Sequence, residues 1–196
     1  MVELEDITFE VPSIEEIYKY LAEIARRIKE NKLSIDLIVG ISRGGLIPAR
    51  YLSDFLLIPE IKIVSAGFYL GPKQRMEKPI IYSPITEDLT GKNVLLVDDV
   101  ADTGETLIEV QKHIKEKGAK NVYTAVIYVK PWNKAKVDFY IKETSAWVIF
   151  PWERVETAKQ ISKLKGRDKL QKILSSDKLY SEVANIFLSE DYEEES

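Results

Sequence analysis

The chain has 196 residues, of which 45% are hydrophobic and 31% charged, with a formal net charge of −4. This length suits one domain with a small appendage, and the acidic balance excludes the basic field that draws proteins onto nucleic acids or anionic membranes. Cysteine is absent and His113 is the single histidine, which excludes disulfides, thiolate zinc sites and cysteine nucleophiles. A bound metal would therefore need oxygen ligands.

The N-terminal sequence MVELEDITFE is acidic and lacks the basic flank and apolar core of a signal peptide. No apolar run is long enough to span a membrane. We therefore expect a cytoplasmic protein without a membrane partner. Its high content of Lys and Glu, with little Met, is a leaning seen in proteins from hot environments, including archaea.

The first predicted helix follows Ser13 and Glu16, which form a capping-box pattern, and runs to about Asn31 at helical apolar spacing. Short apolar segments rich in Val and Ile predict strands at residues 35–41, 61–68, 94–97, 122–129 and 147–150. Helical stretches at 45–57 and 103–117 separate several of these strands. Such alternation indicates a mostly parallel sheet covered by helices on both faces.

Two segments interrupt this pattern. Residues 71–79 are bounded by Gly and Pro and carry four charges, which predicts a long mobile loop. From 155 to 188 the chain is amphipathic and Lys-rich, with breaks at Gly166 and near 175–177, and the acidic residues 190–196 predict a disordered tail. We expect a core domain over 1–153 and a helical C-terminal extension over 154–196.

The segment from Val94 to Leu107 predicts a buried strand, two acids, a polar turn and a helix start. The turn from Asp102 to Thr106 offers backbone N–H groups, two hydroxyls and a glycine at a helix N-terminus, which together suit a phosphate. Asp98 and Asp99 would repel a phosphate but suit ribose hydroxyls, a divalent metal or a developing positive charge. The segment therefore predicts a ligand that joins a phosphate to a sugar.

This segment resembles the signature of the type I phosphoribosyltransferases, which is matched by Asp98, Asp99, Asp102, Thr103, Gly104 and Thr106. The resemblance implies an α/β fold with a twisted, mostly parallel sheet, helices on both faces and a small hood. It also implies that the residues from Ala101 to Thr106, Glu105 included, hold the 5-phosphate of phosphoribosyl diphosphate. The alternative is an ordinary strand–turn–helix with a polar cap.

Ser42, Arg43 and Gly44 lie in a second predicted strand, glycine loop and helix start. Such a backbone nest binds a second phosphate, although a simple helix entrance is the alternative. The string is similar to one in bacterial xanthine-guanine phosphoribosyltransferases, which implies a diphosphate-binding loop with a cis peptide between Ser42 and Arg43. By the same resemblance Arg75 belongs to a flap that closes over the diphosphate, against the alternative of a charged surface loop.

In family members that use 6-oxopurines, a Lys donates to the purine oxygen and an aromatic residue stacks on the ring. The resemblance assigns these roles to Lys130 and Trp147, and edge recognition to the backbone of Val148. The alternatives are a solvated strand-end Lys and a core Trp. Two departures from the relatives lie nearby: Glu105, where a small residue is expected, and residues 131–134, which lack a glycine.

The resemblance thus implies a purine phosphoribosyltransferase that makes a nucleoside 5-monophosphate and diphosphate. Asp102 would be the general base, while Asp98 and Asp99 would stabilise the cationic transition state and hold Mg²⁺ directly, through ribose hydroxyls or through water. Members of the family are usually dimers or tetramers, so we expect a homo-oligomer. Two alternatives stay open: adenine in place of the 6-oxopurine, and a regulator that senses phosphoribosyl diphosphate without catalysis.

Overall fold

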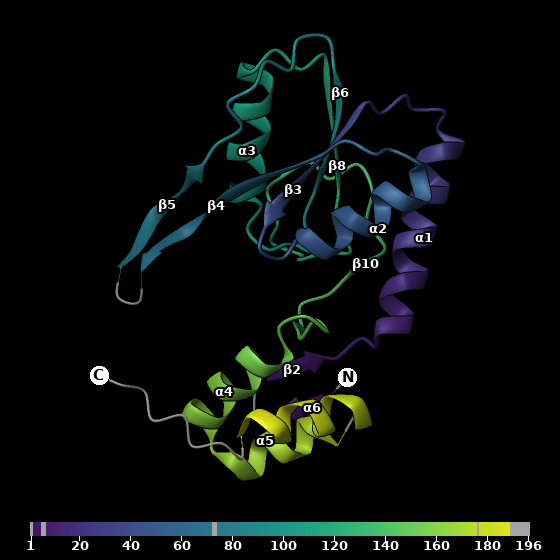
Figure 1. Ribbon diagram of the computed structural model, residues 1–196. Helices are drawn as coiled ribbons and strands as arrows, with labels where there is room; N and C mark the ends of the chain where they lie inside the picture. Colours follow the sequence, from purple (N-terminus) through teal and green to yellow (C-terminus); the bar gives the residue numbers. More distant parts are fainter. Residues whose placement is uncertain (1, 5–6, 72–73, 176, 189–196) are drawn as a thin grey trace. The chain divides into compact units, whose positions relative to one another are not determined.

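The computed structural model describes residues 2–4, 7–71, 74–175 and 177–188 (Figure 1). Contacts divide the chain into two compact units, one of residues 18–144 and one that joins residues 1–17 to residues 145–196. The helix α1 (Ile14–Glu30) begins in the smaller unit and continues in the larger. No helix in the described part of the chain is long and apolar enough to cross a membrane.

The larger unit is built on a five-stranded sheet with the order β5-β4-β3-β6-β8. Its strands are β3 (Leu37–Ser42), β4 (Ile61–Gly71), β5 (Gln74–Ser83), β6 (Asn93–Val97) and β8 (Asn121–Ala125). The strands β4, β3, β6 and β8 run parallel, and β5 pairs antiparallel with β4 at the edge. The predicted mostly parallel sheet is confirmed.

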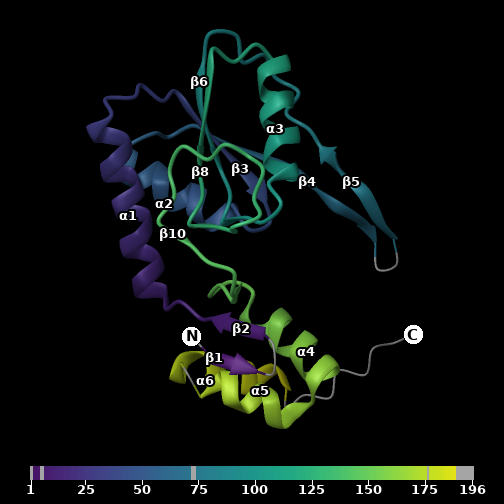
Figure 2. The same ribbon diagram turned by 180° about the vertical axis from the view of Figure 1, so that it is seen from behind.

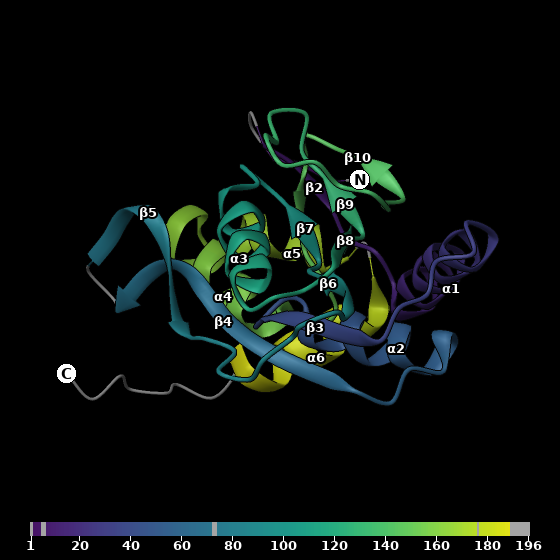
Figure 3. The ribbon, with the colours of Figure 1, turned by 90° about the horizontal axis from the view of Figure 1, so that it is seen from above.

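Helices cover both faces of this sheet. The helix α2 (Leu46–Leu56) connects β3 to β4, and α3 (Glu105–Glu116) connects β6 to β8. Because these two crossovers run in opposite directions from the centre of the sheet, right-handed connections place their helices on opposite faces, as Figure 3 shows. The helix α1 packs beside α2, where the ring of Tyr18 lies 5.4 Å from that of Tyr51.

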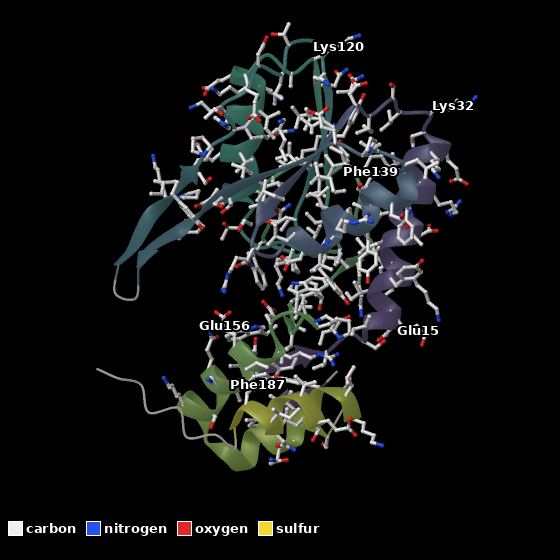
Figure 4. The ribbon with its side chains drawn as sticks, viewed as in Figure 1. Glu15, Lys32, Lys120, Phe139, Glu156 and Phe187 are labelled. Carbon is white, nitrogen blue, oxygen red and sulfur yellow. The ribbon has the colours of Figure 1, made fainter. Side chains whose placement is uncertain are left out.

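The core explains the apolar runs of the central strands. Leu37 and Val39 on β3 and Leu96 on β6 are completely buried, because a parallel sheet between two helical layers has no solvent-facing side. Phe139 is buried at the end of this core and pairs with Ala125 of β8 (Figure 4). The buried central strands form a rigid base for the loops that follow them.

The loop predicted at 71–79 is wrong for the residues that the structure describes, and its mobility stays a prediction. Gly71 and residues 74–79 belong to a β4–β5 hairpin, while residues 72–73 lie outside the described part. Pro79 reads as a strand breaker in the sequence, but it lies on an edge strand, where a missing N–H is tolerated. The hairpin has register shifts, which also weaken the alternating pattern that predicts a strand.

The single strand predicted at 122–129 is two strands, β8 and β9 (Tyr128–Val129). Between them Ile127 donates its backbone N–H to the carbonyl oxygen of Asp99 at 3.0 Å. This turn starts a small second sheet of order β10-β9-β7, with β10 (Lys142–Glu143) and β7 (Val100–Ala101). The loop after β6 is therefore tied to the segment after β8.

Besides the start of α1, the described residues of the smaller unit form three helices and a three-stranded sheet of order β1-β2-β11. Its elements are β1 (Val2–Leu4), β2 (Ile7–Glu10), β11 (Trp147–Val148), α4 (Arg154–Lys165), α5 (Arg167–Leu174) and α6 (Lys178–Leu188). The predicted helix breaks at Gly166 and near residues 175–177 are confirmed, and β1 contacts α5 (Figure 2). The predicted tail at 190–196 lies outside the described residues.

The core of this unit corrects the boundary expected at residue 153. Phe9 and Ile149, which the sequence places in the core domain, are buried with Ala158 and Ile173 of the C-terminal helices. Arg154 ties the same parts together, because its guanidinium donates to the carbonyl oxygen of Pro12 and to a carboxylate of the α5–α6 turn. The amphipathic helices need an apolar partner, and the short terminal strands supply it.

Candidate active site

Two loops meet at the carboxyl ends of β3 and β6. Ser42 ends β3, and Asp98 and Asp99 follow β6 directly, so the parallel strands bring both loops to one edge of the sheet. A Cβ atom at Gly44 would overlap the carboxylate of Asp99, and one at Gly45 would overlap the carbonyl oxygen of Val97. The glycines therefore permit a contact between the loops that any larger residue would prevent.

The first loop supplies backbone groups. The peptide bond between Ser42 and Arg43 is cis, as expected. Gly45 precedes α2 and makes no side-chain cap, and the amides of Gly45 and Leu46 donate to the carbonyl oxygens of Ile41 and Arg43 at 2.8 and 3.2 Å. Arg43 is exposed beside them. The cis bond is confirmed, and diphosphate binding by this loop stays a prediction.

The two acids after β6 differ in their surroundings. Asp99 is buried, and its carbonyl oxygen accepts hydrogen bonds from the amides of Ile127 and Tyr128. Burial raises the pKa of Asp98 well above its ordinary value, and repulsion by the Asp99 carboxylate raises it further, although backbone amides of Asp99 and Gly45 oppose this. A positive charge at this edge would relieve the repulsion and favour the charged carboxylates.

The second loop runs from Ala101 to Thr106 into α3. Gly104 precedes the helix with φ of 80°, a left-handed conformation that glycine adopts without strain, and it provides no side-chain cap. The Thr103 hydroxyl accepts weakly from the amide of Glu105 at 3.4 Å. The positive end of α3 therefore faces a short, glycine-bearing turn with hydroxyls on Thr103 and Thr106, which suits an anion.

Residues 130–135 brace this second loop, and we call them the brace segment. Its backbone amides at Lys130 and Lys134 donate to the carbonyl oxygens of Ala101 and Thr103 at 2.9 and 3.0 Å. A Cβ atom at Gly104 would overlap the side-chain oxygen of Asn133, so the two segments are in close contact. The loop from Ala101 to Thr106 is therefore held mainly by the brace segment rather than by its own side chains.

Three side chains at this contact were not singled out as functional by the sequence. The indole nitrogen of Trp132 donates to Oδ1 of Asp102 at 2.7 Å. Lys134 forms an ion pair with Glu105 at 3.4 Å, and the side chain of Asn133 accepts from the amide of Ala135 at 3.1 Å. The two departures from the relatives, at Glu105 and in residues 131–134, therefore contact each other. The presence of both departures in one sequence was the signal that could have pointed to this contact.

The predicted base-binding residues belong to different units. Lys130 is buried after β9, with its ammonium 5.9 Å from the ring centre of Trp132, in the larger unit. In the smaller unit Trp147 is 41% exposed and stacks on Phe9, while Val148 is buried. Trp147 is thus partly exposed and packs on one side against Phe9. The structure describes the backbone of Arg75 in β5, opposite Tyr69, but the Arg75 side chain lies outside the described residues.

The chain matches a family model over residues 10–156, that of the phosphoribosyl transferase domain. The chain belongs to this family. The match spans the sheet, both loops and the brace segment, and it makes the protein an enzyme that transfers a pentosyl group. Members of the family generally use Mg²⁺ in catalysis.

Similar proteins agree with this membership. A xanthine-guanine phosphoribosyltransferase of Cereibacter sphaeroides is 34% identical over 134 residues, which cover 67% of this chain and 75% of that protein. Another, of Idiomarina loihiensis, is 32% identical over 143 residues, covering 72% and 84%. The crystal structure of a purine phosphoribosyltransferase from Pyrococcus horikoshii aligns with a TM-score of 0.66 at 37% identity, covering 74% of this chain and 94% of that one.

Proposed function

We propose that this chain is a purine phosphoribosyltransferase of the salvage type. It transfers the 5-phosphoribosyl group from phosphoribosyl diphosphate to a 6-oxopurine, which is guanine, xanthine or hypoxanthine, and releases nucleoside 5-monophosphate and diphosphate. The observation that carries the proposal is the meeting of Asp98, Asp99 and the glycine-capped start of α3 at one edge of the sheet. A sugar phosphate needs both features side by side.

The predicted site residues divide the work of this reaction between them, and some take two roles. The loop from Ala101 to Thr106 binds the 5-phosphate, and the loop from Ser42 to Gly44 binds the diphosphate, with Arg75 over it. Asp98 and Asp99 face the ribose and stabilise the positive charge that develops as the bond from C1′ to the diphosphate oxygen breaks. Two adjacent carboxylates that repel each other are suited to this task.

Mg²⁺ fits the same two carboxylates. It prefers oxygen ligands and keeps several from substrate and water, so two protein carboxylates are enough to anchor it. Burial, and after it repulsion by Asp99, raises the pKa of Asp98, and a bound cation would favour the charged form of both carboxylates. When bound, Mg²⁺ neutralises the charge on the diphosphate that leaves.

The base is attacked through its five-membered ring. As a ring nitrogen bonds to C1′, Asp102 accepts the proton that this nitrogen loses. Lys130 donates to the oxygen on the six-membered ring, while stacking by Trp147 and edge contact by the backbone of Val148 stay expectations from the family resemblance. Support for a 6-oxopurine comes from the buried Lys130, because an ammonium donates to an oxygen and not to the amino group of adenine.

A nucleotide-formation assay tests the proposal. The full-length protein is incubated with phosphoribosyl diphosphate, Mg²⁺ and, separately, hypoxanthine, guanine, xanthine, adenine and uracil, and released diphosphate and nucleotide are both quantified. We expect turnover with at least one 6-oxopurine and little with adenine or uracil. Turnover with adenine alone would make adenine the substrate in place of a 6-oxopurine. Binding of phosphoribosyl diphosphate without turnover would favour the regulator. Cytoplasmic location and assembly into a dimer or tetramer stay predictions.

A further inference from the structure

Trp132 is the brace-segment side chain that reaches the proposed general base. Its indole N–H donates to Oδ1 of Asp102 at 2.7 Å, a short and direct hydrogen bond. Half of the Trp132 side chain is exposed, at 51%, so burial in a core does not account for its position. A large aromatic residue held at the surface against a reacting carboxylate calls for a functional reason.

The backbone fixes Trp132 relative to Asp102. The residues on either side of Trp132 in the brace segment, Lys130 and Lys134, donate backbone hydrogen bonds to the residues on either side of Asp102, Ala101 and Thr103. One backbone hydrogen bond lies on each side of Trp132 and Asp102. The two backbone segments therefore hold the indole and the carboxylate next to each other. A side-chain hydrogen bond with this support loses little conformational entropy when it forms.

The chemistry of the indole suits a carboxylate that must accept a proton. Its nitrogen is a donor only, so it takes up one carboxylate oxygen without ever competing for the proton. The second oxygen, Oδ2, is then the acceptor, and rotation of the carboxylate is restricted. The Lys130 ammonium lies over the same indole at 5.9 Å, which links the side chain that recognises the base to the side chain that orients the carboxylate.

We infer that Trp132 is a positioning residue that orients Asp102 for proton transfer from the purine. This rests on the proposed function, in which Asp102 takes the ring-nitrogen proton while the bond to C1′ forms and the bond from C1′ to diphosphate breaks. Trp132 itself touches no reacting atom. Its loss leaves the phosphate loop in place, because the backbone hydrogen bonds of the brace segment do not depend on the indole.

The test compares Trp132→Phe with the parent enzyme under saturating Mg²⁺. The phenyl ring keeps an aromatic surface near Lys130 but removes the N–H donor. We expect kcat to fall about tenfold, which is the effect of one hydrogen bond lost from the transition state, while KM for phosphoribosyl diphosphate stays unchanged. Benzothienylalanine at position 132 keeps the shape of the indole without the N–H, and it should lose as much as Phe.

Asp102→Ala supplies the background that separates positioning from structure. In that background Trp132→Phe should cost no further kcat, because the carboxylate that it orients is gone. Parent-like kcat in Trp132→Phe or in the benzothienylalanine protein would overturn the inference, and so would an equal loss with and without Asp102. Failure of the proposed function looks different: the parent makes no nucleotide, or Asp102→Ala keeps full activity.

Discussion

The two loops at the active edge reach a fixed shape by different means. The loop from Ser42 to Gly45 is fixed by close contacts at its own glycines, since a Cβ atom at Gly44 would meet the side chain of Asp99 and one at Gly45 would meet the backbone of Val97. The loop from Ala101 to Thr106 has one such contact, at Gly104, and otherwise depends on hydrogen bonds from the brace segment. The first loop therefore resists substitution locally, while the second is adjusted by residues thirty positions away.

This difference indicates which part of the site can change its base specificity. A loop fixed by glycines tolerates almost no variation, so it suits a diphosphate common to every reaction of this kind. A loop held by a second segment varies together with that segment, and the same segment starts at Lys130, the proposed contact to the base. Base preference and the geometry of Asp102 are thus linked through one stretch of chain.

The largest expected effect comes from Lys130→Met, which removes a charged donor but keeps the backbone amide that holds Ala101. For a 6-oxopurine we expect a loss of about 2 to 4 kcal/mol of transition-state binding, because a desolvated oxygen loses its partner. The value of kcat/KM for each base measures it. Equal activity of the variant and the parent would remove Lys130 from the base site and leave phosphoribosyl transfer intact.

Gly45→Ala should have the next largest effect, on the loop fixed by backbone contacts. The added methyl group meets backbone atoms of Val97 and Ile41, which cannot move aside as a side chain would, so we expect a loss of about 1 to 3 kcal/mol in the free energy of unfolding. Denaturant unfolding measures it. The control is Gly67→Ala, where a Cβ atom meets nothing within 4 Å. Equal stability of the two variants would contradict the tight loop.

The smallest effect is expected from Lys134→Met, at the ion pair with Glu105. Lys134 is 70% exposed, so the pair contributes less than about 1 kcal/mol and weakens in salt. The matched control is Lys136→Met, which removes the ion pair between the exposed Lys136 and the partly buried Asp138. Nucleotide binding should change slightly in the first variant and not in the second. A loss in Lys134→Met as large as that in Lys130→Met would mean that the brace depends on this side chain.

The sequence predicts the local parts of this site well. Apolar runs, glycines and the capping pair specify β3, β6, α1 and both loops, because these signals act between near neighbours. The brace is different: Trp132, Asn133 and Lys134 follow a strand end and carry no periodic pattern, so only the folded chain shows that they contact Asp102, Gly104 and Glu105. The β4–β5 hairpin escaped prediction for a similar reason, since its Pro79 is acceptable only at a sheet edge.

The central claim is that the loop from Ala101 to Thr106 binds the 5-phosphate, and calorimetry tests it most directly. A nucleoside and its 5-monophosphate, carrying the base that the enzyme uses, are titrated into the parent, Thr103→Val and the distant control Thr86→Val. We predict that the parent and Thr86→Val bind the monophosphate at least tenfold more tightly than the nucleoside, and that Thr103→Val narrows this difference without changing nucleoside affinity. Equal affinity of the parent for both ligands, or an unchanged difference in Thr103→Val, would contradict the account.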